Sequence, residues 1–341
     1  MCTKICALLL TALLTSVEVS LVEACRAETW GRAGLTTNQL VWGIQGGVHF
    51  AISPDGFRGH EPRGLIRLGY PILADGGYDL INFIAVEPIA NGTKGFSELE
   101  PSALDRIPGK RFWASSFHTS SGVPSPDPGE VSLAAPNIEQ LEVTIRVERF
   151  QNGAHVFLVI TQRSDAPDEI TLTIHLEPDS APVEICTLTA TMGNLIRARD
   201  LWLKNEVVHS SDLYAGYHGT EFAPHTVFTL DRLSRLPSGD VIVAATSNER
   251  DPSSIFPYPG TAKWHYGGTN VTQYWREPAR LVDNQLQAVV NARRMYWRSD
   301  HPIPGGVAYE NFELRVPFHD GQQFIFGITR KTPKELGIQI K

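Results

Sequence analysis

The sequence predicts an all-β protein, a large antiparallel β-sandwich with few short helices. Two observations lead to this prediction: several segments alternate strictly between apolar and polar residues, and short turn sequences separate them. Roughly a dozen strands are expected between Leu40 and Arg330 from this pattern. No internal repeat or low-complexity tract interrupts it.

The alternating segments are 141–150, 169–178 and 311–318, each with one apolar and one polar face. Such strands have one face in a core and one in solvent. Three other segments, 155–161, 240–246 and 323–329, are nearly continuous apolar runs. These are typical of strands at the centre of a sheet, buried on both faces.

Short turn sequences predict hairpins between successive strands, at 151–153, 166–168 and 319–321. Helices are few. Segment 281–297 has apolar residues at helical spacing but is equally compatible with a strand, and a short turn of helix is expected around 98–105.

Residues 1–27 have the layout of a secretory signal peptide: Lys4, an apolar run, then small and polar residues. The apolar run is shorter than the roughly 20 residues of a spanning helix, so no membrane span is expected. We therefore expect a secreted or periplasmic protein, cleaved after Ala24 or Ala27. Lipid anchoring at Cys25 is an alternative, although Glu23 departs from the lipoprotein pattern.

Cleavage after Ala27 leaves Cys186 as the single cysteine, which excludes an internal disulfide and a cysteine-based zinc site in the mature chain. The net charge of −7 disfavours nucleic acid as a partner. The expected organisation is N-terminal strands in 28–130 and the main sandwich in 131–341, forming one continuous domain. The oligomeric state does not follow from the sequence.

No nucleotide-binding loop, zinc-protease or serine-hydrolase motif is present. A first candidate site lies in 189–203, where Asn194, Arg197 and Arg199 interrupt apolar residues. Both arginines are predicted on one face of a strand. The planar donors of arginine suit the hydroxyl or carboxylate groups of a substrate. The alternative is a solvated outer face.

A second candidate is 209–225, which contains three histidines, two carboxylates and two tyrosines. Its spacing matches no metal-ligand motif, so no metal and no other cofactor is expected. Tyr217 and His218 are candidates for proton transfer because histidine titrates near neutral pH. Otherwise the segment is a polar loop.

The third candidate is Glu310, which follows a glycine-rich turn at the start of a strongly patterned strand. This turn, the strand, His319-Asp320-Gly321 and the final strand resemble the closing section of galactose mutarotase-like supersandwich proteins. The resemblance implies that Glu310 is a base in a sugar-binding concavity, with His218 or His225 as its partner. No counterpart of the Asn-His-x-Tyr/Phe strand of true mutarotases is present.

Segment 256–275 is rich in aromatic rings and is interrupted by prolines and glycines, which predicts a long excursion from the sandwich. Trp264, His265 and Tyr266 cannot all point inward. Aromatic rings suit the apolar faces of sugars, so these three residues are candidates for ligand stacking, with packing onto the sandwich as the alternative.

Together these features predict an exported carbohydrate-active protein. As an enzyme it would be a polysaccharide lyase or a sugar epimerase that removes a proton from a sugar carbon. The alternative is a non-catalytic carbohydrate-binding or cell-surface interaction module, and fold alone does not separate the two.

Overall fold

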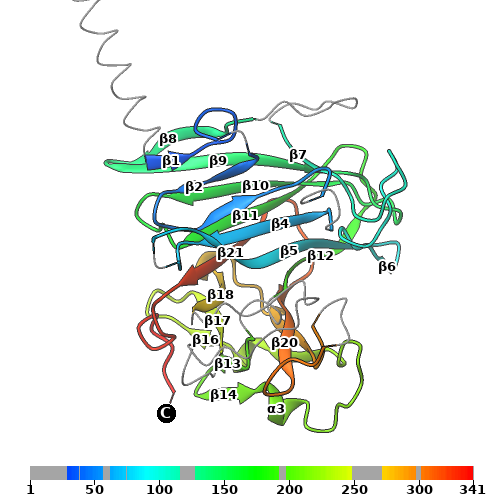
Figure 1. Cartoon of the computed structure of the whole chain (residues 1–341), viewed down its shortest axis with the longest axis vertical. Coiled ribbons are helices and arrows are strands. Elements are labelled where there is room, and N and C mark those ends of the chain that lie inside the picture. The colour runs from blue at the N-terminus through cyan, green and yellow to red at the C-terminus, as the bar shows by residue number, and fades with distance from the viewer. Residues whose placement is uncertain are drawn as a thin grey trace, which may run out of the picture.

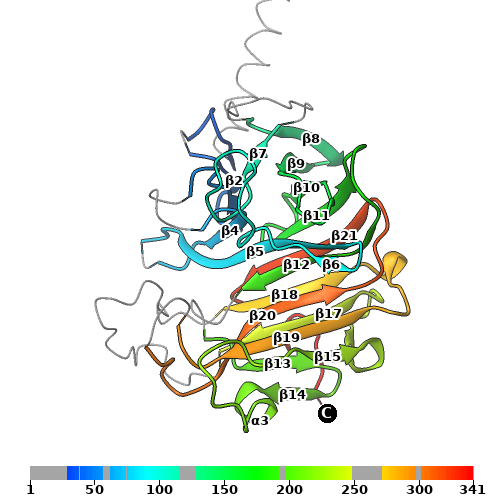
Figure 2. The same ribbon diagram turned by 90° about the vertical axis from the view of Figure 1, so that its right-hand side faces the viewer.

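The computed structural model describes residues 29–37, 39–56, 62–73, 75–115, 127–191, 197–247, 271–296 and 301–340. Two large sheets account for nearly all regular structure in these residues, and both are antiparallel (Figures 1 and 2). The helical elements with bounds in the described residues are the short helix α3 (Ser210–Leu213) and the 3₁₀ turns η2 (Leu230–Arg232) and η3 (Ala279–Leu281). The predicted β-sandwich is confirmed.

The ten-stranded sheet can be followed down the molecule in Figure 2 through β5, β12, β20, β19 and β15. Its strands, in spatial order, are β1 (Trp30–Gly31), β2 (Val41–Ile44), β3 (His49–Ala51), β4 (Leu65–Tyr70), β5 (Asp79–Ala90), β12 (Val183–Thr191), β20 (Ala308–Arg315), β19 (Gln287–Arg293) and β15 (Thr226–Thr229), with β6 (Thr93–Lys94) paired to β5.

The eleven-stranded sheet forms the other layer. Its strands, in spatial order, are β14 (Glu206–His209), β13 (Asp200–Leu203), β17 (Val241–Thr246), β18 (Thr272–Glu277), β21 (Gln322–Thr329), β11 (Glu169–Leu176), β10 (Val156–Arg163), β9 (Ile138–Val147) and β7 (Phe112–Ala114), with β16 (Ser234–Arg235) paired to β17 and β8 (Glu130–Ala135) paired to β9.

The alternating segments place their apolar faces in one core between the sheets. Leu141, Val143 and Ile145 of β9 and Phe312 and Leu314 of β20 are almost fully buried in it. Central strands β17 and β21 are buried on both faces, as their continuous apolar sequences predict. Segment 287–293 is strand β19 and not a helix, and 98–105 contains turns but no helix.

Two of the three predicted hairpins form, since β9 pairs with β10 and β10 pairs with β11. The third prediction was wrong. Residues 319–321 join β20 to β21, which belong to different sheets: β20 pairs with β12 and β19, whereas β21 pairs with β11 and β18. The turn sequence specifies a chain reversal but not which neighbours the two strands take.

The strand pair β5–β12 connects the N-terminal strands to the later part of the chain through a long register, from Val183↔Ala90 to Thr191↔Phe83. The proposed division at residue 130 remains a prediction. In the described residues, no helix has the length and apolar character needed to cross a membrane.

A tight turn at 96–100 covers part of the outward face of the ten-stranded sheet. Ser97 fastens it: its Oγ donates to the carbonyl of Gly64 at 2.6 Å and accepts from the amide of Val86 at 2.9 Å. The Ser97 amide also donates to the Val86 carbonyl at 3.2 Å. Gly64 makes this close approach possible, because a Cβ there would lie 1.9 Å from the Ser97 carbonyl oxygen.

We expect Gly64→Ala to lower the free energy of unfolding by about 2–4 kcal/mol, measured by urea denaturation. The substitution combines a left-handed φ of 69° with a backbone clash at Ser97. Gly92→Ala is a matched control, because Gly92 has the same φ of 69° and nothing within 4 Å of the added Cβ. It should cost only about 1 kcal/mol. Equal losses for the two variants would contradict the clash.

Candidate functional site

A cavity of about 200 Å³ lies on the outward face of the ten-stranded sheet, over β4, β5, β12, β20 and β19. We call it the sheet-face pocket. Its apolar wall consists of Leu65, Phe83 and Ala85, which form a cluster separate from the main core, together with Phe96, Leu99 and Phe222. Its polar wall consists of Glu87, Lys94, Glu98, Thr189, Thr191, His225, Asn291, Glu310 and Asn311.

Strand register brings this polar wall together from distant parts of the sequence. Thr191 of β12 lies opposite Phe83 of β5 on one side and opposite Asn311 of β20 on the other. Side chains directly opposite on one sheet face are close neighbours. The Oγ1 of Thr191 accordingly lies 3.4 Å from Oδ1 of Asn311.

An irregularity in the pairing of β19 and β20 directs Glu310 to the pocket. Val290 pairs with Phe312 and Ala292 pairs with Tyr309, so Asn291 alone faces both Glu310 and Asn311. This is a β-bulge, which inserts one extra residue and shifts the alternation of faces. Tyr309 and Phe312 both reach the main core, whereas Glu310 and Asn311 both line the pocket.

Asn291 stabilises the bulge through its own side chain. Its Oδ1 accepts a hydrogen bond from the backbone amide of Asn311 at 3.0 Å. The extra residue of the bulge leaves the Asn311 amide without a backbone acceptor in the strand ladder, and this bond satisfies it. Asn291 is nearly fully buried, so the arrangement is held away from competing water.

Burial raises the pKa of Glu310 to about 7, and the positive charge of Arg293 opposes this shift. Glu310 has no solvent-exposed surface although it borders the pocket. A ligand therefore reaches its carboxyl only if the pocket lining moves. A carboxyl with a pKa near neutrality can both accept and release a proton under physiological conditions.

A second group of charges surrounds Glu87. Its Oε2 lies 2.7 Å from Nζ of Lys94, and Thr189 Oγ1 contacts both Glu87 and Glu313. A hydroxyl carries one proton, so Thr189 donates to one of these carboxylates at a time. Burial raises the pKa of Glu87, opposed by Lys94 and reinforced by Glu313.

His225 lies at the mouth of the pocket, and its Nε2 is 3.4 Å from Nδ2 of Asn291. Because Oδ1 of Asn291 accepts from Asn311, its Nδ2 group faces the histidine, which favours the imidazole with the proton on Nδ1. Partial burial lowers the pKa of His225, and the positive charges of Lys94 and Arg315 lower it further. It is therefore neutral at pH 7.

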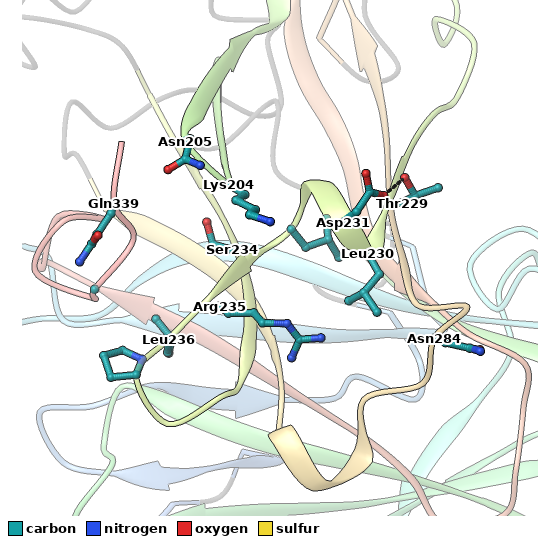
Figure 3. Close-up of a pocket in the computed structure, with 13 residues that line it drawn as sticks. Lys204, Asn205, Thr229, Leu230, Asp231, Ser234, Arg235, Leu236, Asn284 and Gln339 are labelled. Atoms are coloured by element: carbon teal, nitrogen blue, oxygen red, sulfur yellow. Dashed lines mark hydrogen bonds between the residues drawn. The ribbon is translucent and has the colours of Figure 1, made fainter. Parts of the chain in front are cut away.

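A larger cavity of about 720 Å³ lies between the β13–β14 turn, η2 and residues near the C-terminus (Figure 3). Its charged groups, Lys204, Asp231 and Arg235, are exposed, and Asp231 accepts a hydrogen bond from Thr229 at 2.6 Å. That bond lowers the pKa of Asp231. The sheet-face pocket is the better candidate site, because it alone of these two cavities has carboxyls with raised pKa values.

The other two residues predicted to transfer protons lie outside the sheet-face pocket. His218 is exposed, with its Nδ1 3.2 Å from a guanidinium nitrogen of Arg294. Tyr217 packs against the core and donates to the carbonyl of Glu221. Neither lines the pocket, whereas His225, named with His218 from the family resemblance, does.

The two predicted substrate-binding arginines do not share a strand face. Residues 197–199 precede β13, and Arg197 has a left-handed φ of 46°, which breaks the alternation that the prediction assumed. Both side chains are buried instead of solvated. The Arg199 guanidinium donates to the carbonyl of Pro304 and packs on Gly305. Arg199 therefore lies against the turn before β20.

Several predicted features fall outside the described residues. They are the signal peptide with Cys25, Asn194, and the ring-rich residues Trp264, His265 and Tyr266. Within the described residues, no group of three or more histidine, cysteine, aspartate or glutamate side chains is placed to hold a metal ion.

Sequence reasoning missed Lys94, Glu98, Thr189 and Asn291 as parts of the site. One signal was present: Glu87 is the single charge in 81–90, the buried part of strand β5, and a lone buried carboxylate needs a partner. Asn291 similarly interrupts the apolar run of β19. The sequence around Glu87 and Asn291 does not show which residues contact them, because the partners come from other strands.

Comparisons with known proteins give little further information. No family model and no curated protein matches the chain. A search of solved structures finds similarity to a GalM/aldose epimerase homologue from C. elegans, 9% identical, covering 84% of this chain and 97% of that chain, with a TM-score of 0.25. A likeness of this size assigns no residue and no activity to this chain.

We expect Glu310→Gln to change how stability depends on pH. The unfolded carboxyl ionises near 4.5 and the folded one near 7, so the wild type loses stability as pH rises between these values. The variant lacks this loss. Its unfolding free energy relative to wild type should therefore rise by up to about 3 kcal/mol between pH 4 and pH 8. Urea denaturation across this range measures it, with exposed Glu142→Gln as control. A difference independent of pH would contradict the raised pKa.

Asn291→Ala removes the acceptor for the Asn311 amide. We expect a loss of about 1–3 kcal/mol in the free energy of unfolding, because a buried donor is left unsatisfied. Chemical denaturation measures this, and exposed Asn284→Ala should change stability by less than about 0.5 kcal/mol. Similar values for the two variants would show that Asn291 does not stabilise the bulge.

Proposed function

We propose that this chain is a carbohydrate-active protein that binds a single sugar in the sheet-face pocket and moves a proton at a sugar carbon, as epimerases do. Glu310 would be the base. The observation that carries this proposal is a buried carboxyl with a pKa of about 7 directed to a pocket by a β-bulge. Perturbed carboxyls of this kind cluster at catalytic sites.

The size of the pocket favours a monosaccharide over a polymer. Pockets for drug-sized ligands typically occupy about 300–1,000 Å³. The sheet-face pocket, at about 200 Å³, accommodates a smaller molecule. Between the two enzyme classes expected from the sequence, this favours a sugar epimerase over a polysaccharide lyase.

The pocket wall also supports a sugar as the ligand. Phe83, Phe96 and Phe222 give it an aromatic side, which suits the apolar C–H faces of a pyranose. Thr191, Asn291 and Asn311 add amide and hydroxyl groups to the lining for sugar hydroxyls. A mixed wall of this kind is typical of small-ligand sites with a few orienting polar groups.

In the proposed reaction, ionised Glu310 takes a proton from a carbon next to a carbonyl or carboxyl group. The C–H electron pair becomes part of an enol, and return of a proton to the other face inverts the carbon. The asparagine side chains of the polar wall would stabilise the developing oxyanion. We further propose that the chain is exported through the signal peptide at 1–27.

A non-catalytic carbohydrate-binding module is the alternative, and one observation favours it: Glu310 has no exposed surface. Such a module needs only the aromatic and amide walls. In that case Glu310 would serve to hold the bulge region in place, and the pocket would bind a sugar without turnover.

Deuterium exchange separates the two functions. We expect purified mature protein in D₂O to replace a carbon-bound hydrogen of one sugar in a panel of D-glucose, D-galactose, D-mannose and D-glucuronate, followed by ¹H NMR. The rate should rise with pH through about 7, because only ionised Glu310 accepts a proton. Glu310→Gln should lower it by at least about 100-fold.

Binding of the same sugars is the control, measured by isothermal titration calorimetry on both proteins. Binding without exchange would establish the module instead of the enzyme. If no sugar in the panel binds, the assignment to carbohydrate is wrong.

A further inference from the structure

The turn at 96–100 brings a second carboxyl, that of Glu98, to the lining of the sheet-face pocket. Glu98 lines the cavity there, between Phe96 and Leu99. Its Oε2 is buried and has no hydrogen-bond partner among the described residues. Buried carboxyl oxygens normally have partners, so an unpartnered one on a residue that lines a cavity indicates a group that a ligand can complete.

The turn holds Glu98 rigidly. The amides of Leu99 and Glu100 both donate to the Phe96 carbonyl, at 3.3 and 3.0 Å, and the carboxylate of Glu100 accepts from the Phe96 amide. Ser97 is tied to β4 and β5, and its carbonyl accepts from the Lys110 amide at 2.6 Å. A residue fixed on both sides is suited to a precise contact with a ligand.

We propose that Glu98 is the proton donor of this site, the catalytic acid that acts opposite Glu310. This inference rests on the proposed function. Glu98 and Glu310 come from different elements, the 96–100 turn and β20, and line the same small cavity. A ligand in this cavity would contact both carboxyls once the pocket lining moves to expose Glu310.

Burial and the charges around Glu98 keep it protonated. Glu87 of β5 and Glu100 of its own turn raise its pKa and Lys94 of β6 lowers it, while the other titratable groups in the pocket lining are His225 and Glu310, the latter beside Arg293. Burial, and next the negative charge of Glu87, raise the pKa of Glu98 to about 8. At pH 7 Glu98 is therefore mainly a neutral acid, while about half of Glu310 is ionised.

The step balances with these two groups alone. Glu310 takes the proton from the sugar carbon, and the C–H electron pair forms the C=C bond of an enediol. The π pair of the neighbouring C=O moves to its oxygen, which takes the proton of Glu98. For inversion, the enediol turns over in the pocket and presents its other face to protonated Glu310, which returns a proton to the carbon. Glu98 takes back the proton of the enediol hydroxyl as the C=O re-forms. No oxidant, metal or further reactant enters the step.

The test compares Glu98→Gln with wild type in the deuterium-exchange assay on the same sugar panel. Wild type should give a bell-shaped pH profile, rising through about 7 and falling through about 8 as Glu98 loses its proton. Glu98→Gln should lower the rate by about 100-fold or more and remove the falling limb.

Glu277→Gln is the matched control. Burial also raises the pKa of Glu277 to about 8, but Glu277 lies at the end of β18 and does not line the pocket. Its substitution should leave the exchange rate and both limbs unchanged. Carbon-13 NMR of Glu carboxyls provides a readout without substrate: one resonance titrating near 8 should vanish in Glu98→Gln and another in Glu277→Gln.

The outcomes separate the two proposals. One outcome is that wild type exchanges a carbon-bound hydrogen, Glu310→Gln does not, and Glu98→Gln keeps the bell-shaped pH profile of the exchange rate. Glu98 is then not the acid, and the proposed function stands. If wild type exchanges no hydrogen in any sugar of the panel, the proposed function fails and the role of Glu98 fails with it. A Glu98 resonance that titrates near 4.5 would also overturn this inference.

Discussion

The β-bulge between β19 and β20 is the feature on which the candidate site depends. Without the extra residue, Glu310 would share a face with Phe312 and Leu314 and lie in the core between the sheets. The bulge turns Glu310 and Asn311 outward while Tyr309 stays in the core. Asn291 stabilises it from the neighbouring strand, so one buried side chain both completes the backbone bonding and contributes to the pocket wall.

Burial then gives this face its chemistry. Carboxyls on an open sheet surface would ionise near 4, but Glu87, Glu98 and Glu310 are enclosed, and enclosure disfavours their charged forms. The 96–100 turn contributes Phe96, Glu98 and Leu99 to the pocket lining, and it packs on the sheet because Gly64 has no side chain to prevent it. Burying these carboxyls together lowers the stability of the fold, as is common where polar groups serve a function.

Several residues that the sequence pointed to as candidates for a site do not line the sheet-face pocket. They contact other parts of the fold instead. Arg199 positions the turn before β20, and His218 lies on the surface beside Arg294. Tyr214, from the same polar segment as His218, donates to the carbonyl of Val290 in β19. The density of chemically active residues in 209–225 therefore did not by itself locate the pocket. Only Phe222 and His225 of this segment line it, and the other lining residues come from several strands and the 96–100 turn.

The sequence by itself determined the sandwich, the strands with one core face, and the position of Glu310 as a carboxylate at a strand start. It could do so because alternation of apolar residues is a local property, imposed by the period of a strand. It did not determine that residues 319–321 connect two sheets, that β19 is a strand, or that Arg197 lies outside one. Strand pairing, the bulge and the presence of Glu98 and Glu310 in the lining of one cavity were decided by the tertiary structure. Each depends on which distant segments become neighbours, and no local pattern records that.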